Sequence, residues 1–202
     1  MNSASANAAP TKVRFIVLAG LCVAAALSYI ARNAIAVAES TVRADLGLTK
    51  GQSGWLMSAF FFSYALCQIP GAQFGKATGP RRALPLFAAV WSVATAVTAF
   101  AGGLVSFVAA RIVQGVAGAM MVPVGRLVVL RSVPKSQLVT ALAYLTFPAL
   151  VGPVLGPPVG GLITTWFDWR WIFFINLPIG IIAMLGVAAT VPETPRDPNR
   201  TF

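Results

Sequence analysis

The stretch GPVLGPPVGG, Gly152–Gly161, contains four glycines and three prolines, and it lies in a run without charges over residues 136–167. Glycine and proline are the poorest helix formers in water. In lipid, however, a helix tolerates both, because neighbouring helices and local adjustments satisfy the freed backbone groups. The stretch is therefore predicted to lie in a membrane-spanning helix. Glycines at every fourth position share one helical face, which another backbone can approach closely; they are Gly152, Gly156 and Gly160.

The composition of the whole chain points the same way. Of its 202 residues, 57% are hydrophobic and 10% are charged, whereas an average soluble domain is about 25% charged. Long uncharged windows predict an all-α membrane protein, a six-transmembrane-helix bundle over residues 12–192. A polar tail precedes it at 1–11, and a polar, Pro-rich tail or linker follows at 193–202. The expected helices lie near 13–36, 52–74, 83–100, 104–127, 138–165 and 171–190.

The positive charges predict how the bundle lies in the membrane. The net charge is +10, but the basic residues lie between apolar blocks instead of forming one patch, which argues against nucleic-acid binding. Cytoplasmic loops are enriched in Lys and Arg, so an inner or plasma membrane protein with both termini in the cytoplasm is expected. The cytoplasmic side would hold Lys12, Arg14, Lys76, Arg81, Arg82, Arg131, Lys135, Arg196 and Arg200, and the outer side Arg43, Lys50 and Arg170.

Residues that carry enzymatic chemistry are scarce. Histidine is absent, and Cys22 and Cys67 each lie inside an apolar block without metal-ligand spacing. No phosphate loop and no pairing of a nucleophile with a base is visible in the sequence. The chain is therefore predicted not to be an enzyme, and neither a metal site nor a cofactor is expected.

Four motifs resemble those of one transporter family. They are IPGAQFGKATGPRRALPLF at 69–87, RIVQGVAGAMMVP at 111–123, GPVLGPPVGG at 152–161 and WRWIFFINLPIG at 169–180. Their order resembles the amino-terminal six-helix half of the major facilitator superfamily, which is built from 3+3 inverted repeats. Residues 29–91 are more similar to organic-anion:proton symporters, and residues 111–180 to the drug:proton antiporter branch. In the first motif the family signature falls on Gly75, Gly79, Arg81 and Arg82.

The resemblance implies transport of a small organic solute, a drug-like compound or an organic anion, by alternating access. The chain would act as half of a secondary carrier, with a second six-helix half or a second copy as its partner and the lipid bilayer around both. Two departures, Ala31 and Lys76, stand where the family has an acid. A transport-inactive truncated or interacting membrane protein is the alternative.

The resemblance also assigns a role to the face of the fifth helix. It implies packing or gating against the other half, and the alternative is close packing within the chain's own bundle. The residues concerned are Gly152, Pro153, Gly156, Pro157, Gly160 and Gly161.

Arg32 and Arg111 are predicted to lie within the membrane, where an arginine costs about 2.5 to 3.5 kcal/mol on insertion scales. In transporters of this type helices 1 and 4 line the central cavity, so these arginines would form a positive wall that attracts anionic groups. Snorkelling to the outer interface is the alternative for Arg32. Gln114, one turn from Arg111, and Asn33 are further cavity candidates.

Acidic residues are few, and none is clearly within the membrane. A proton gradient is a candidate driving force, and Glu39, at the outer end of the first helix, is the best remaining candidate for proton coupling. Tryptophans near the predicted outer helix ends are expected to form an interfacial belt; they are Trp55, Trp166, Trp169 and Trp171. The run Phe60–Phe62 is expected to face lipid or the core.

Overall fold

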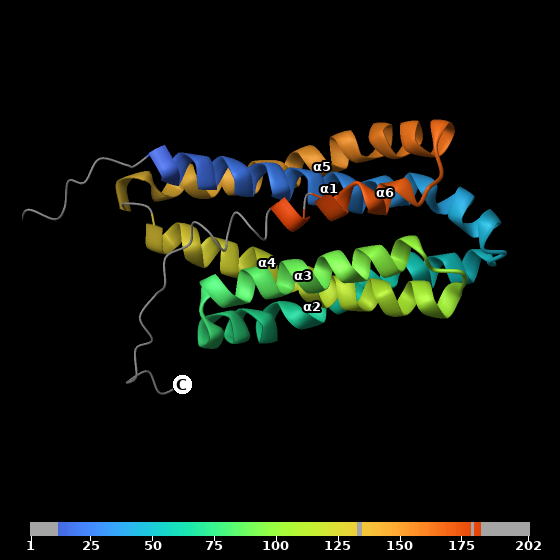
Figure 1. Ribbon diagram of the computed structural model, residues 1–202, viewed down its shortest axis with the longest axis horizontal. Helices are drawn as coiled ribbons and strands as arrows, with labels where there is room; N and C mark the ends of the chain where they lie inside the picture. Colours follow the sequence, from blue (N-terminus) through green and yellow to red (C-terminus); the bar gives the residue numbers. More distant parts are fainter. Residues whose placement is uncertain (1–11, 133–134, 179, 183–202) are drawn as a thin grey trace, which may run out of the picture.

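The computed structural model describes residues 12–132, 135–178 and 180–182, and they form helices joined by short turns (Figure 1). The predicted tails at 1–11 and 193–202, and the end of the predicted sixth helix, lie outside the described residues. In chain order the elements are α1 (Lys12–Asp45), α2 (Lys50–Thr78), α3 (Pro80–Ala99), α4 (Leu104–Ser132), the 3-10 turn η2 (Lys135–Gln137), α5 (Leu138–Trp166) and α6 (Trp171–Phe174).

The prediction of an all-α six-helix bundle is confirmed, but α1 is longer than expected. It continues to Asp45, beyond the predicted end near residue 36. The added turns are polar on one side, where Arg43 Nε lies 3.2 Å from Glu39 Oε1, and they bury Val42 on the other. The predicted end lies where the apolar window gives way to charged residues. An i,i+4 ion pair stabilises a helix, so α1 continues past that point.

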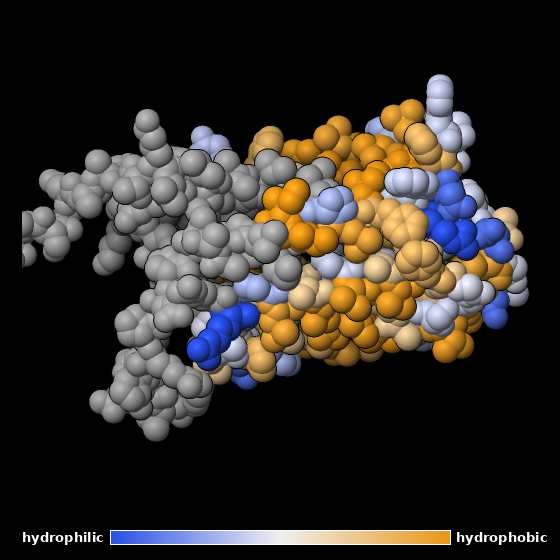
Figure 2. All heavy atoms as spheres, in the orientation of Figure 1, coloured by the Kyte–Doolittle hydropathy of each residue, from blue (hydrophilic) through white to orange (hydrophobic). Residues whose placement is uncertain are grey.

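Three helices of the described part are long and apolar enough to cross a membrane by length and composition. They are Arg82–Ala99, Leu104–Arg126 and Leu138–Trp166. A shorter apolar segment covers Trp171–Ile182. In the orientation of Figure 2, apolar side chains cover the middle of the coloured surface, and polar side chains lie at both of its ends.

The helices pack as two groups. Figure 1 shows α1 and α5 together on one side, and α2, α3 and α4 together on the other. The short helix α6 contacts both groups, α3 most of all. The largest contacts are those of α1 with α5 and of α2 with α4. Exchanging helix 1 with 4 and helix 2 with 5 converts one of these pairs into the other, which is the relation expected of 3+3 inverted repeats.

The glycine face of α5 packs on α1 of the same bundle. A Cβ atom at Gly152, Gly156 or Gly160 would collide with Tyr29, Asn33 or Ala34, respectively. The prediction that these three glycines meet another half is therefore corrected: they are already covered, because their missing side chains let α1 approach. The other residues predicted for packing or gating are not covered by α1 in this way. Pro153 and Pro157 are exposed, and no atom lies near the position of a Cβ at Gly161.

Gly160→Ala should therefore destabilise the bundle, whereas Gly161→Ala should not. At Gly160 the new Cβ would lie 2.5 Å from the carbonyl oxygen of Ala34, a backbone atom that cannot rotate away. Overpacking of this kind costs about 1–3 kcal/mol. Denaturant titration of both variants in detergent micelles measures the difference. Equal unfolding free energies for the two variants would refute the close contact between α1 and α5.

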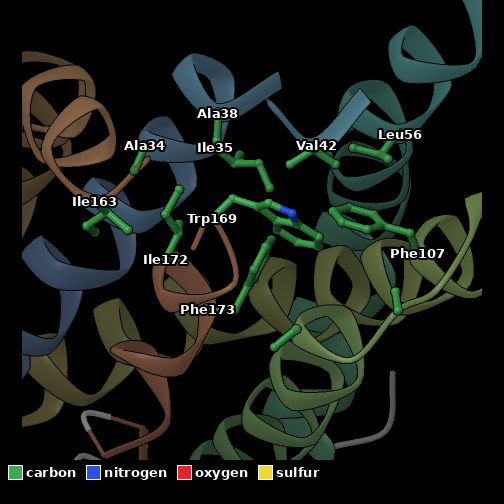
Figure 3. Packing of buried hydrophobic residues seen from close by; sticks show 12 residues of the cluster. Ala34, Ile35, Ala38, Val42, Leu56, Phe107, Ile163, Trp169, Ile172 and Phe173 are labelled. Carbon is green, nitrogen blue, oxygen red and sulfur yellow. The ribbon is translucent and has the colours of Figure 1, made fainter. Parts of the chain in front are cut away.

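Trp169 occupies the centre of the core at the end of the bundle where α5 turns into α6. Figure 3 shows its ring among Ile35 and Val42 of α1, Phe107 of α4 and Phe173. Its side chain is 1% exposed, and its Nε1 donates a hydrogen bond to Asp45 Oδ2 at 3.1 Å. The predicted tryptophan belt is thus corrected at this position, because a ring in the α5–α6 turn reaches inward between the helix ends. Trp55, Trp166 and Trp171 are exposed.

Candidate functional site

Arg111 lies on α4, buried among three helices. Its side chain is 2% exposed, and its Nη1 donates a hydrogen bond to Gln114 Oε1 at 2.8 Å. The two residues share one face of α4 because they are three positions apart. Gln114 Nε2 in turn donates to Thr95 Oγ1 on α3 at 2.7 Å.

Arg32, on α1, lies in a group of aromatic rings. Its Cζ is 4.7 Å from the ring centroid of Phe60 and 4.9 Å from that of Tyr64, both on α2. The rings of Tyr29 and Trp91 are 5.0 and 5.8 Å away. A cation–π contact is worth about 2 kcal/mol when the pair is desolvated.

Phe60 joins the two arginines. It is fully buried, and the Cζ of Arg111 lies 4.6 Å from the same ring centroid that Arg32 contacts. Two positive groups, from α1 and α4, therefore converge on one ring of α2. We call Arg32, Phe60, Arg111 and Gln114 the arginine cluster.

The charges of the arginine cluster are not neutralised within the described part of the chain. The acids described there pair elsewhere: Glu39 with Arg43, and Asp45 and Asp168 with Arg170. Nε of Arg32 and both Nε and Nη2 of Arg111 are buried without a hydrogen-bond partner. A guanidinium with buried, unpaired N–H groups favours the binding of an anion beside it.

Two predicted site residues lie apart from the cluster. Asn33 donates from Nδ2 to the carbonyl oxygen of Tyr29 at 2.7 Å, and its Cβ faces Gly156 at the contact of α1 with α5. Glu39 lies two turns beyond Arg32 and pairs with Arg43. Its role in proton coupling stays a prediction.

The loop signature between α2 and α3 forms a tight turn. Gly79 has φ 86°, a backbone conformation that favours glycine, and it ends α2 and begins α3 in one residue. Gly75 lies so close to Val124 of α4 that a Cβ atom at this position would collide with the valine side chain. Arg82 is exposed, whereas the side chain of Arg81 lies outside the described part. These residues therefore shape the end of the bundle opposite Trp169.

Sequence reasoning missed the aromatic and hydroxyl partners of the arginines. Phe60 contacts both arginines, Tyr64 and Trp91 contact Arg32, and Thr95 binds Gln114. Each of the four stands in a largely apolar window of the sequence. Phe60 is buried, whereas its neighbours Phe61 and Phe62 are exposed. A local pattern cannot separate the three, because only the approach of α1 and α4 decides which ring is enclosed.

The fold and the buried charges define an integral, multi-pass membrane protein built as a helix bundle. The chain belongs to the Major Facilitator Superfamily, whose sequence model matches residues 21–201. Membership in this family of transporters agrees with the prediction that the chain is not an enzyme.

Curated relatives carry the name "Putative multidrug resistance protein MdtD". The relative from Citrobacter koseri is 34% identical over 158 residues, which is 76% of this chain and 34% of the relative. The relative from Salmonella paratyphi B is 45% identical over 95 residues, 47% of this chain and 20% of the relative. The chain thus spans about a third of the length of the first of these proteins.

Solved structures show the same fold. A bacterial homologue of the human lysosomal transporter Spinster, inward-facing and occupied, matches with a TM-score of 0.77 at 22% identity, over 96% of this chain and 48% of that chain. The human organic anion transporter MFSD10 matches with a TM-score of 0.65 at 15% identity, over 92% of this chain and 48% of that chain. The bundle described above therefore corresponds to half of a major facilitator fold.

Proposed function

We propose that the chain forms the amino-terminal half of a secondary carrier that moves a small organic anion across the membrane by alternating access. A complementary six-helix half, from a further stretch of polypeptide or a second copy, would complete the translocation path. The family match and the half-fold support the proposal that the chain is part of a carrier. The arginine cluster supports the proposal that the substrate is an anion.

The observation that carries the substrate class is the pair Arg32 and Arg111. Each carries a guanidinium, and neither has a carboxylate partner in the described residues. A guanidinium binds a carboxylate with two parallel N–H bonds. A substrate carboxylate would therefore supply the counter-charge that the protein lacks. The same excess charge repels lipophilic cations, a common class of drug.

Orientation and energy source complete the proposal. The excess of Lys and Arg in the loops beside the termini supports a cytoplasmic position for both ends. A proton gradient is the proposed driving force. Drug efflux is the second candidate activity, and the name of the MdtD relatives favours it.

Uptake by proteoliposomes tests the proposal. The chain is reconstituted alone and with a complementary half, and uptake of radiolabelled glucuronate is compared with that of tetraphenylphosphonium. We expect saturable glucuronate uptake, and tetraphenylphosphonium at the level of empty liposomes. Movement of the cation alone would favour drug transport. Movement of neither, under both conditions, would favour the transport-inactive alternative.

A further inference from the structure

A chain of buried hydrogen bonds runs from Arg111 through α4 into α3. Arg111 donates to Gln114, Gln114 donates to Thr95, and Thr95 Oγ1 donates to the carbonyl oxygen of Trp91 at 2.7 Å. Thr95 is fully buried and Gln114 is 3% exposed, so water does not compete for these bonds. The ring of Trp91 lies over Arg32. The chain therefore ends on the residue that contacts the other arginine.

The direction of each bond in this chain is fixed by chemistry. A backbone carbonyl only accepts, so the hydroxyl of Thr95 donates its proton to the carbonyl of Trp91 and accepts a hydrogen bond from Gln114. The Gln114 amide must then turn its NH2 toward Thr95 and its oxygen toward Arg111. Arginine only donates, so this is also the amide orientation that Arg111 needs. A free amide could turn either way, and the wrong orientation would place N–H groups against a guanidinium.

We propose that Thr95 is a positioning residue of the anion site: its hydroxyl sets the orientation of the Gln114 amide, and the amide oxygen aims the guanidinium of Arg111. One nitrogen of Arg111, Nη1, donates to Gln114, while Nε and Nη2 are buried without a hydrogen-bond partner. In the proposed site, these two nitrogens would donate to the substrate carboxylate. The inference rests on the proposed function and adds a residue of α3, which touches no ligand itself, to the determinants of anion affinity.

Thr98 provides a matched control on the same helix. Like Thr95 it is fully buried, and its Oγ1 also donates to the carbonyl four residues earlier, that of Ala94, at 2.7 Å. Thr98 makes no side-chain hydrogen bond to another helix in the part of the chain that the structure describes. Substituting valine at either position removes the same hydroxyl from the same helix, but only one of the two oxygens holds Gln114.

The test compares radiolabelled glucuronate binding by the purified full chain in nanodiscs. Thr95→Val should raise the Kd about tenfold, because Gln114 loses its acceptor and its fixed orientation. Thr95→Ser should restore the wild-type Kd, and Thr98→Val should leave it unchanged. In a Gln114→Leu background, Thr95→Val should have no further effect, since no amide is left to orient.

Each outcome decides a different point. Equal Kd values for wild type, Thr95→Val and Thr98→Val would overturn the positioning role and leave the proposed function intact. Equal losses for Thr95→Val and Thr98→Val, or an additive loss in the Gln114→Leu background, would also overturn it, because general weakening of packing would then explain the effect. If Thr95→Val yields no folded protein, Thr95→Ala removes the same oxygen with a smaller side chain. Absence of glucuronate binding by the wild type would overturn the proposed function and this role together.

Discussion

Trp169→Ala should lower the free energy of unfolding by about 3–5 kcal/mol, the range typical of removing a large aromatic side chain from a core. The ring is enclosed by the ends of α1, α4 and α6, and its loss would leave a cavity that rigid helix ends cannot fill. It would also leave Asp45 without its indole N–H donor, although Arg170 Nη1 remains 3.1 Å from the same oxygen. Denaturant titration in detergent micelles, followed by circular dichroism, measures the change.

Trp166→Ala is the matched control. This tryptophan lies three residues earlier and is 77% exposed, so its removal should change the unfolding free energy by less than about 0.5 kcal/mol. Trp169→Phe should fall between the two, because it keeps an aromatic ring and loses the bond to Asp45. If Trp169→Ala were as stable as Trp166→Ala, the turn between α5 and α6 would not hold the helix ends together as described.

Arg111→Ala should reduce glucuronate transport about 100-fold or more, which is the range for removing one partner of a desolvated charged contact. We expect the free energy of unfolding to change much less than the transport rate. Arg111 is buried with two unpaired nitrogens and no acid beside it, so the folded protein gains little from its charge. Truncation to alanine also leaves a cavity and deprives the Gln114 amide oxygen of its donor. We expect these opposing effects to offset one another, so that the unfolding free energy of Arg111→Ala stays within about 1 kcal/mol of the wild type. Initial uptake rates and denaturant titration are measured on the same preparations.

Two further variants separate charge from shape. Arg111→Lys keeps a positive charge but loses the planar fork, so transport should recover only in part. Lys50→Ala removes an exposed cation at the start of α2, outside the motifs of the family, and should leave uptake at the wild-type level. Equal transport by Arg111→Ala and Lys50→Ala would contradict the anion site. A loss of transport together with a large loss of stability would assign Arg111 a structural role instead.

The sequence by itself determined the class of fold, because length and hydropathy act locally. A chain with 57% hydrophobic residues in helix-length blocks must bury them in lipid, and only helices satisfy the backbone there at this segment length. The motifs around Gly79, Arg111 and Gly152 were sufficient to indicate the transporter family. The positions of Arg32 and Arg111 within apolar segments marked both as site candidates, because a charge in lipid is costly wherever the helix packs.

The tertiary structure decided which faces meet. The spacing of Gly152, Gly156 and Gly160 predicts that a backbone comes close, and only the fold shows that this backbone is α1 of the same bundle. Trp169 and Trp166 are indistinguishable by local pattern, yet one fills the core and the other is exposed. The contact of Phe60 with both arginines and the bond of Gln114 to Thr95 join different helices. They depend on distances between elements that no periodicity encodes. Local physical chemistry thus specified helices and costly charges, whereas the close approach of α1, α2, α3 and α4 brought those charges together.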